Sequence, residues 1–154
     1  MEGWVKVNTD ATVFQDGSVG VGCVMRDSQG AFLGARCCRK MGAWSPREAE
    51  AIGMKEALSW VIARKNQCCI MESDSRMLVQ ACNGSPGEAM FGTIVGDCIQ
   101  LLKHINPVLV RFTYRSANSV AHALAKANYS MSGEREWLDS PSGFILHVLE
   151  NDSI

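Results

Sequence analysis

Three carboxylates stand where local structure does not require them. Asp10 lies in the segment from Trp4 to Thr12, whose alternating pattern predicts a β-strand, although Asp is depleted in strands. Glu50 lies one turn into a predicted helix, and Asp74 follows a short apolar segment typical of a buried strand. Carboxylates held close together repel and raise one another's pKa, which a divalent cation relieves. Such oxygen ligands favour Mg²⁺ or Mn²⁺ and suit phosphodiester hydrolysis with two metal ions.

Each of these carboxylates also has a simpler interpretation. Asp10 could end its strand and cap the following turn, Glu50 could be a solvated helix residue, and Asp74 could cap the next helix. The order of the elements favours a joint site. If the fourth strand lies beside the first, Asp10 and Asp74 become neighbours and Glu50 reaches them from the helix.

The predicted elements begin with three strands joined by turns, which indicates an antiparallel meander. The helix that follows starts at Ser45, where Pro46 and Glu48 complete a capping box, and runs to about Arg64. The strands are predicted at Trp4 to Thr12, Val19 to Arg26, Ala31 to about Arg39, Cys68 to Ser73 and Val108 to Tyr114. Further helices are predicted from Ser75 to Cys82, from Ser85 to Lys103, and from Ser116 or Asn118 to Ala127.

This order predicts an α/β fold with a five-stranded mixed sheet, three strands antiparallel and then two parallel, flanked by helices. Residues 1–154 are interpreted as one domain, with about 130–154 as a tail packed on it. Gly20 and Gly22 alternate onto one face of the second strand. Because glycine in a strand often marks a close approach to the backbone, we expect that face to be open for a ligand.

The composition excludes several classes of protein. With a net charge of −1, the chain is not a strongly basic domain that holds nucleic acid mainly by counterion release, although a local basic patch is compatible with it. It has no apolar segment of the roughly 20 residues that span a bilayer and no signal-peptide pattern, so we expect a nuclear or cytoplasmic protein without a membrane partner. The seven cysteines include no C-x-x-C pair and are interpreted as buried thiols rather than as a zinc site.

The chain resembles the ribonuclease H fold and, within it, the plant reverse-transcriptase-like branch derived from non-LTR retroelements. The resemblance covers essentially the whole chain. The residues that carry it are Val5-Lys6-Val7-Asn8-Thr9-Asp10, Gly20 to Arg26 with Gly30, Glu48-Ala49-Glu50-Ala51 ending in Glu56-Ala57-Leu58, Glu72-Ser73-Asp74-Ser75, Arg115 to Ala125, and Trp137, Pro141 and Phe144-Ile145 in the tail.

The resemblance implies an endonuclease that cuts the RNA strand of RNA–DNA hybrids with an Asp-Glu-Asp-Asp quartet and two Mg²⁺ ions, without an organic cofactor. The first three acids correspond to Asp10, Glu50 and Asp74, and Asp10 would bridge both metals. The fourth acid is expected one helical turn after Asn118, where this chain has His122. A neutral imidazole can bind a metal but brings no negative charge, so the activity could be attenuated or could prefer Mn²⁺. His122 could instead act in proton transfer or product release, or simply pack under the last loop.

The resemblance also guides the prediction of nucleic-acid contacts. Bacterial members carry a mobile histidine near the end of the fifth strand, where Arg115 stands here, and some carry a basic insertion that the short segment from Cys82 to Glu88 lacks. The predicted nucleic-acid-binding residues are Asn8, Gly20, Gly22, Arg115 and Asn118, with Arg36, Arg39 and Lys40 as weaker candidates.

Two other functions remain open at this stage. The replacement at His122 and the near-neutral charge are compatible with a domesticated retroelement domain that binds nucleic acid or protein without turnover. Another nuclease or transposase of the same fold is a third possibility, although the helix from Asn118 to His122 favours the ribonuclease branch.

Overall fold

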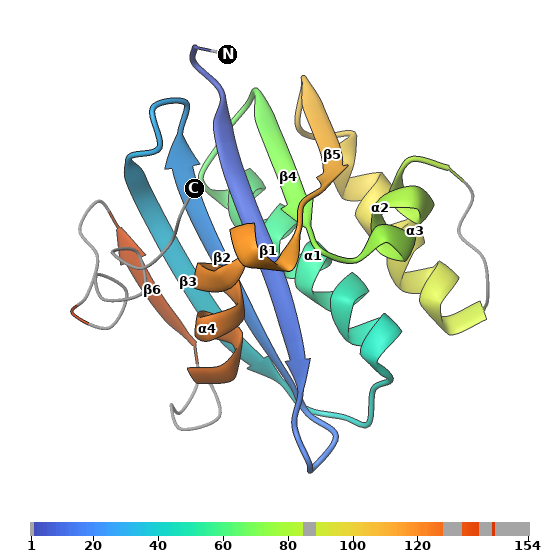
Figure 1. Cartoon of the computed structure of the whole chain (residues 1–154). Helices are drawn as coiled ribbons and strands as arrows, with labels where there is room; N and C mark the ends of the chain where they lie inside the picture. The colour runs from blue at the N-terminus through green and yellow to red at the C-terminus, as the bar shows by residue number, and fades with distance from the viewer. Residues whose placement is uncertain (1, 85–88, 128–133, 139–142, 144–154) are drawn as a thin grey trace.

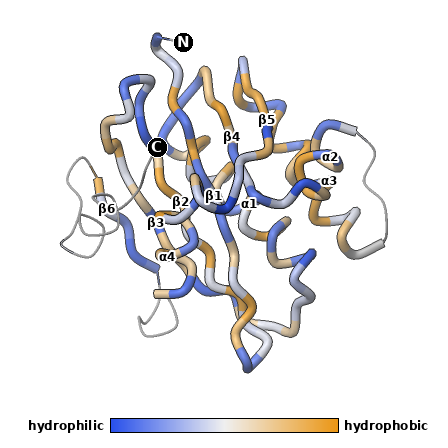
Figure 2. Tube along the Cα trace, in the orientation of Figure 1, coloured by the Kyte–Doolittle hydropathy of each residue, from blue (hydrophilic) through white to orange (hydrophobic). Residues whose placement is uncertain are grey.

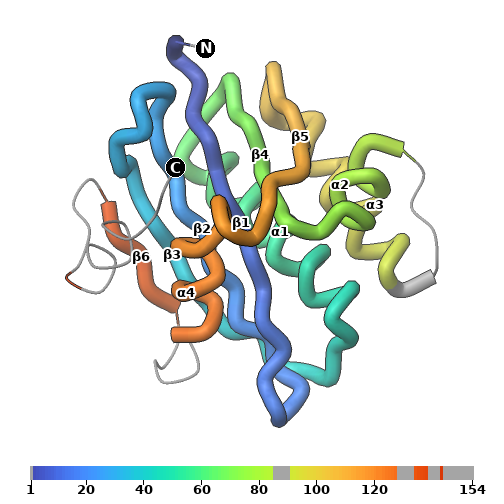
Figure 3. The backbone as a smooth tube through the Cα atoms, viewed as in Figure 1, coloured from blue at the N-terminus to red at the C-terminus, as the bar shows by residue number. Residues whose placement is uncertain are grey.

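The first strand, β1 (Val5–Val13), runs through the middle of the sheet in the computed structural model (Figures 1 and 3). It pairs antiparallel with β2 (Val19–Asp27) and parallel with β4 (Cys69–Ser73). The fourth strand therefore lies beside the first, as predicted, and β1 joins the antiparallel and parallel parts of the sheet. The structure describes residues 2–84, 89–127, 134–138 and 143.

Three further strands complete the sheet. β3 (Phe32–Lys40) pairs antiparallel with β2, and β5 (Val108–Phe112) pairs parallel with β4. These pairings confirm the predicted meander and the two parallel strands. The predicted count of five strands is too low, because β6 (Arg135–Leu138) pairs antiparallel with β3 and gives the order β5-β4-β1-β2-β3-β6. A mostly exposed strand of four residues lacks the alternation that would reveal it in a sequence.

The helices lie on both faces of the sheet (Figure 1). On one face, α1 (Pro46–Ala63) packs with α2 (Arg76–Cys82) and α3 (Ala89–Leu102). On the other face, α4 (Ser119–Ala127) follows a short 3₁₀ turn at Arg115–Ala117.

The capping prediction for α1 is confirmed. The Ser45 hydroxyl accepts a hydrogen bond from the Glu48 amide at 3.2 Å, and the Glu48 carboxylate accepts one from the Ser45 amide at 2.9 Å. The similar cap expected at 85–88 lies outside the described residues. No helix in the described ranges is both long and apolar enough to cross a bilayer.

Two hydrophobic clusters form the core. The larger one fills the space between the sheet and α1, α2 and α3, and includes Met54 and Met71. The smaller one lies under α4 and includes Val24 and Leu124. Hydrophobic residues recur along β4 and β5 (Figure 2), as expected for strands that pack on helices.

The cysteines are part of this core. All seven are free thiols, and six of them are buried, Cys68 being half-buried. The neighbours Cys37 and Cys38 contribute to different clusters, because adjacent strand residues point to opposite faces. Their interpretation as buried thiols is confirmed.

The two glycines of β2 lie against α4 rather than an open surface. A Cβ atom added at Gly22 would lie 2.2 Å from the Ala121 carbonyl oxygen, and one added at Gly20 would lie 2.2 Å from the Ala125 carbonyl oxygen. The expectation of an open ligand-binding face is therefore wrong. The glycines indicated a close approach to the backbone, but the partner is a helix of the same chain.

We expect Gly22→Ala to lower the free energy of unfolding by about 1–3 kcal/mol, because the added methyl group pushes α4 away from β2. Gly96→Ala in α3 is the matched control, since its Cβ atom would meet nothing within 4 Å. It should raise the free energy by roughly 0.5–1 kcal/mol through helix propensity. Urea unfolding measures both changes. A Gly22→Ala protein as stable as the wild type would contradict the described packing.

Candidate metal centre

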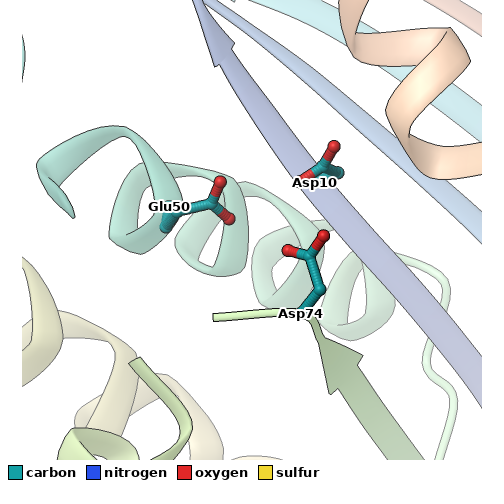
Figure 4. A group of neighbouring side chains, drawn as sticks. All are labelled: Asp10, Glu50 and Asp74. Atoms are coloured by element: carbon teal, nitrogen blue, oxygen red, sulfur yellow. The ribbon is translucent and has the colours of Figure 1, made fainter. Parts of the chain in front are cut away.

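Asp10, Glu50 and Asp74 converge on one point of the structure (Figure 4). Asp10 lies in the second half of β1, Glu50 lies one turn into α1, and Asp74 directly follows β4. One carboxylate oxygen from each residue lies within 4.8 Å of the other two. The parallel register explains this proximity: Asn8 pairs with Glu72, so Asp10 and Asp74 stand level two residues later. The predicted convergence of these three side chains is confirmed.

Burial raises the proton affinity of the carboxylates in the cluster. It raises the pKa of Glu50 to about 9, and the charges of Asp10 and Asp74 add to the effect while Arg115 opposes it. The pKa of Asp10 is also raised, first by burial and then by Asp74, despite the opposing hydrogen bond from His122. Without metal, Glu50 therefore holds a proton at neutral pH that a bound divalent cation would displace.

His122 contacts Asp10 of the cluster from α4, which lies on the sheet face opposite α1. It lies on α4, and its Nδ1 atom is 2.6 Å from Oδ2 of Asp10. Its side chain is 42% exposed, whereas that of Asp10 is only 5% exposed. The imidazole thus lies between the buried carboxylate and solvent, where it can orient Asp10 and exchange protons with water.

Hydrogen bonds hold β1 in place between the two helices beside Asp10. The Thr9 hydroxyl donates to the Gly53 carbonyl on α1 at 3.1 Å. On the other side, the Asn118 side-chain amide donates to the Thr9 carbonyl at 3.0 Å. Because Glu50 and His122 lie one helical turn from Gly53 and Asn118, these bonds fix the elements that carry the site.

Several cationic and aromatic side chains border the cluster at the end of β5. The Nε atom of Arg115 is 3.5 Å from Oδ2 of Asp74, and the Arg115 side chain is 83% exposed. The exposed ring of Tyr114 packs edge-to-face on Phe112, and the Arg76 guanidinium lies 3.8 Å from the centre of the Phe112 ring. Arg76 and Tyr114 were not among the predicted site residues, although an aromatic residue directly before Arg115 was the available signal.

Comparison with known proteins assigns this chain to a family. The reverse transcriptase-like family matches residues 8–128, which contain Asp10, Glu50, Asp74 and His122. The chain belongs to the reverse transcriptase-like family. No curated protein matches it in a sequence search.

Solved structures identify the fold of this reverse transcriptase-like domain. RNase H1 from the halophilic archaeon Halobacterium salinarum superposes with a TM-score of 0.76 at 18% identity, over 82% of this chain and 98% of that one. LC11-RNase H1, isolated from compost and solved with an RNA/DNA hybrid, superposes with a TM-score of 0.73 at 17% identity, over 83% of this chain and 99% of that one. The foamy viral protease–reverse transcriptase, also solved with an RNA/DNA hybrid, superposes with a TM-score of 0.64 at 12% identity, over 80% of this chain and 19% of that one. The fold is therefore ribonuclease H-like, as predicted.

Several predicted nucleic-acid contacts are inaccessible in this domain. Asn8 is only 2% exposed and donates from its side chain to Glu72 at 3.1 Å. Asn118 is only 1% exposed and is engaged with the backbone of β1. Gly20 and Gly22 are covered by α4. These four residues are covered by other parts of the chain, which the alternation of side chains along a strand does not reveal, and their contact with nucleic acid stays a prediction. Arg115 is exposed, and its contact with nucleic acid stays a prediction.

The three weaker candidates on β3 are engaged in ion pairs. Arg36 lies 3.2 Å from the carboxylate of Glu56, which Lys40 contacts at 2.6 Å. Arg39 lies 2.6 Å from Asp16. These cations are therefore part of the contacts that hold β3 to its neighbours.

The raised pKa of Glu50 predicts how stability depends on pH in the absence of metal. Between the ordinary value of 4.5 and the folded value of about 9, the folded protein binds a proton that the unfolded protein releases. The free energy of unfolding should therefore fall as the pH rises through this interval. Urea unfolding in EDTA at several pH values measures the slope.

In the same experiment, Glu50→Gln should flatten the slope and stabilise the protein most at high pH. Glu2→Gln is a suitable control, because Glu2 is exposed and should leave the slope unchanged. An unchanged slope in Glu50→Gln would show that this carboxyl group does not carry the additional proton.

Proposed function

We propose that this domain is a metal-dependent endonuclease that hydrolyses the RNA strand of RNA–DNA hybrids. The observation that carries the proposal is the convergence of Asp10, Glu50 and Asp74 within 4.8 Å on a ribonuclease H-like fold. Two similar structures, of LC11-RNase H1 and of the foamy viral protease–reverse transcriptase, contain an RNA/DNA hybrid.

The three carboxylates fit divalent metal ions. Their oxygens are hard ligands, and the raised pKa values of Asp10 and Glu50 indicate a charge that the protein itself does not compensate. Asp10, Glu50 and Asp74 would hold Mg²⁺, with Mn²⁺ as a possible substitute. When bound, two such ions activate the attacking water and stabilise the leaving oxygen of the phosphodiester.

The surrounding residues of the chain have distinct roles in this proposal. The hydrogen bonds at Thr9 keep Asp10 in a fixed position, which favours a preorganised site. His122 orients the outer oxygen of Asp10 and exchanges a proton with solvent. Arg115 offers an exposed cation beside Asp74, where the negative charge of a bound phosphodiester would lie.

A second candidate function is hybrid binding without cleavage. It is favoured by the hydrogen bond between His122 and Asp10, because His122 stands where related enzymes are expected to carry a fourth acid. A histidine there supplies no negative charge to a second metal ion. The two candidates differ in one observable, the integrity of the RNA strand.

The nuclease proposal predicts that the domain cuts the labelled RNA strand of a hybrid in Mg²⁺ or Mn²⁺ and that EDTA stops the reaction. Asp10→Asn should reduce the rate at least about a hundredfold, because a metal ligand contributes more than the residues that support it. Asp97→Asn, an exposed acid on α3 that pairs with Lys55, is the matched control and should retain the rate. Gel electrophoresis of the labelled RNA measures each rate.

An RNA strand that stays intact with both metals would count against the nuclease. Under that result, hybrid binding measured by fluorescence anisotropy would support the second candidate, and the absence of binding would exclude both.

If residue 122 occupies the place of a fourth metal-binding acid, replacing His122 should change the metal dependence of cleavage. His122→Asp should lower the Mg²⁺ concentration for half-maximal cleavage by about tenfold, equivalent to about 1.4 kcal/mol, because a carboxylate adds negative charge beside Asp10. It should also reduce any preference for Mn²⁺. Metal titrations of the cleavage rate measure both effects, and His104→Asp at the exposed end of α3 controls for the added charge. If the Mg²⁺ requirement stays constant, His122 does not occupy a metal-binding position.

A further inference from the structure

A groove of about 560 Å³ lies on the sheet face that carries α4, towards the beginning of β1. Among the described elements, α4 is the one helix on this face, and it covers β2 from Gly20 to Val24 (Figure 1). The groove lies beyond that helix. The residues that line it and carry the argument are Trp4, Lys6, Arg26, Asp27, Ile70 and Arg111.

The lining of the groove is cationic, although the chain as a whole has a net charge of −1. The charged residues that line it are Lys6, Arg26, Arg111 and one acid, Asp27, and of these Arg26 is only 4% exposed. One Asp27 oxygen is already occupied, because it accepts hydrogen bonds from two backbone amides of the β2–β3 turn at 2.9 and 2.8 Å. Arg111 pairs with Glu72 at 2.7 Å, whereas Lys6 has no ion pair with any residue that the structure describes. The groove therefore favours an anionic ligand.

The groove shares its sheet face with the carboxylate cluster. Lys6, Asn8 and Asp10 alternate onto the same face of β1, and Lys6 pairs with Arg26 on one side and Ile70 on the other. Four residues of strand place Lys6 about 13 Å from Asp10. Along a duplex this distance corresponds to about four nucleotides of one strand.

We propose that this groove is a second phosphate-binding site, which holds the backbone of the bound nucleic acid about four nucleotides from the carboxylate cluster. The proposal rests on the proposed function, because the cluster fixes where the substrate lies. Lys6 supplies the charge that contacts the phosphate. Trp4, which also lines the groove, provides an aromatic side chain on which a nucleobase can stack.

The salt dependence of hybrid binding tests this site. In EDTA, where no cleavage occurs, Lys6→Gln should reduce the slope of log K against log salt by about 1, as expected for one lost phosphate contact. Lys103→Gln, at the exposed end of α3, is the matched control and should keep the wild-type slope. An equal slope for Lys6→Gln and wild type would overturn the proposal. Equal free energies of unfolding in urea for the two variants verify that Lys6→Gln is folded.

A substrate with one neutral methylphosphonate locates the contact. Placed about four nucleotides from the cleavage point, the neutral linkage should weaken wild-type binding as much as Lys6→Gln does, and the two changes together should add nothing further. Additive losses would place the Lys6 contact elsewhere and overturn the proposal.

Kinetics separate this site from the nuclease proposal. Lys6→Gln should raise KM for the hybrid and leave kcat unchanged, since it acts on binding far from the reacting phosphate. Binding that depends on Lys6 without any cleavage would support the groove and contradict the nuclease. Cleavage with a salt slope that is independent of Lys6 would support the nuclease and contradict the groove.

Discussion

Three carboxylates held within 4.8 Å of one another repel, and their burial strengthens the repulsion. The rest of the structure holds them together. Asp10 is held on the central strand, Glu50 on a capped helix and Asp74 at the end of a buried strand. The hydrogen bond from the Thr9 hydroxyl to Gly53 connects the first two of these elements. A large apolar core under α1 stabilises an arrangement that the charges alone would disfavour.

The sequence was sufficient to predict the parts of the site that depend on the order of the strands and on the alternation of side chains along each strand. Asp10 and Asp74 follow from two strands that pair in parallel, and the capping box at Ser45 sets the phase of the helix that carries Glu50. The parts that depend on tertiary contacts were not predictable. Gly20 and Gly22 could equally face a ligand or a helix, and only the folded chain shows that α4 fills the space. Asn8 is buried because Glu72 and Arg111 come from two other strands.

The distribution of charge explains how a chain of net charge −1 can be suited to a polyanionic ligand. Most of the basic residues on β3 are neutralised by Glu56 and Asp16. Arg115 is an exposed cation near the acidic centre, and Lys6 lines the groove at the beginning of β1. Under the proposed function, local field rather than total charge would determine which face attracts a phosphate backbone.

The pairing of β6 with β3 adds a strand to the sheet beyond the residues of the family match. The family match stops at residue 128, but β6 lies at Arg135–Leu138 and covers the outer edge of β3. Trp60 and Arg36 tie this short strand to the body through Glu136 and Glu134, at 2.9 and 2.6 Å. A fragment cut at the family boundary would leave Gly34 to Cys37 of β3 without the strand that pairs with them, and an unpaired edge invites association with a second chain. The described sheet thus extends beyond the residues that the family match covers.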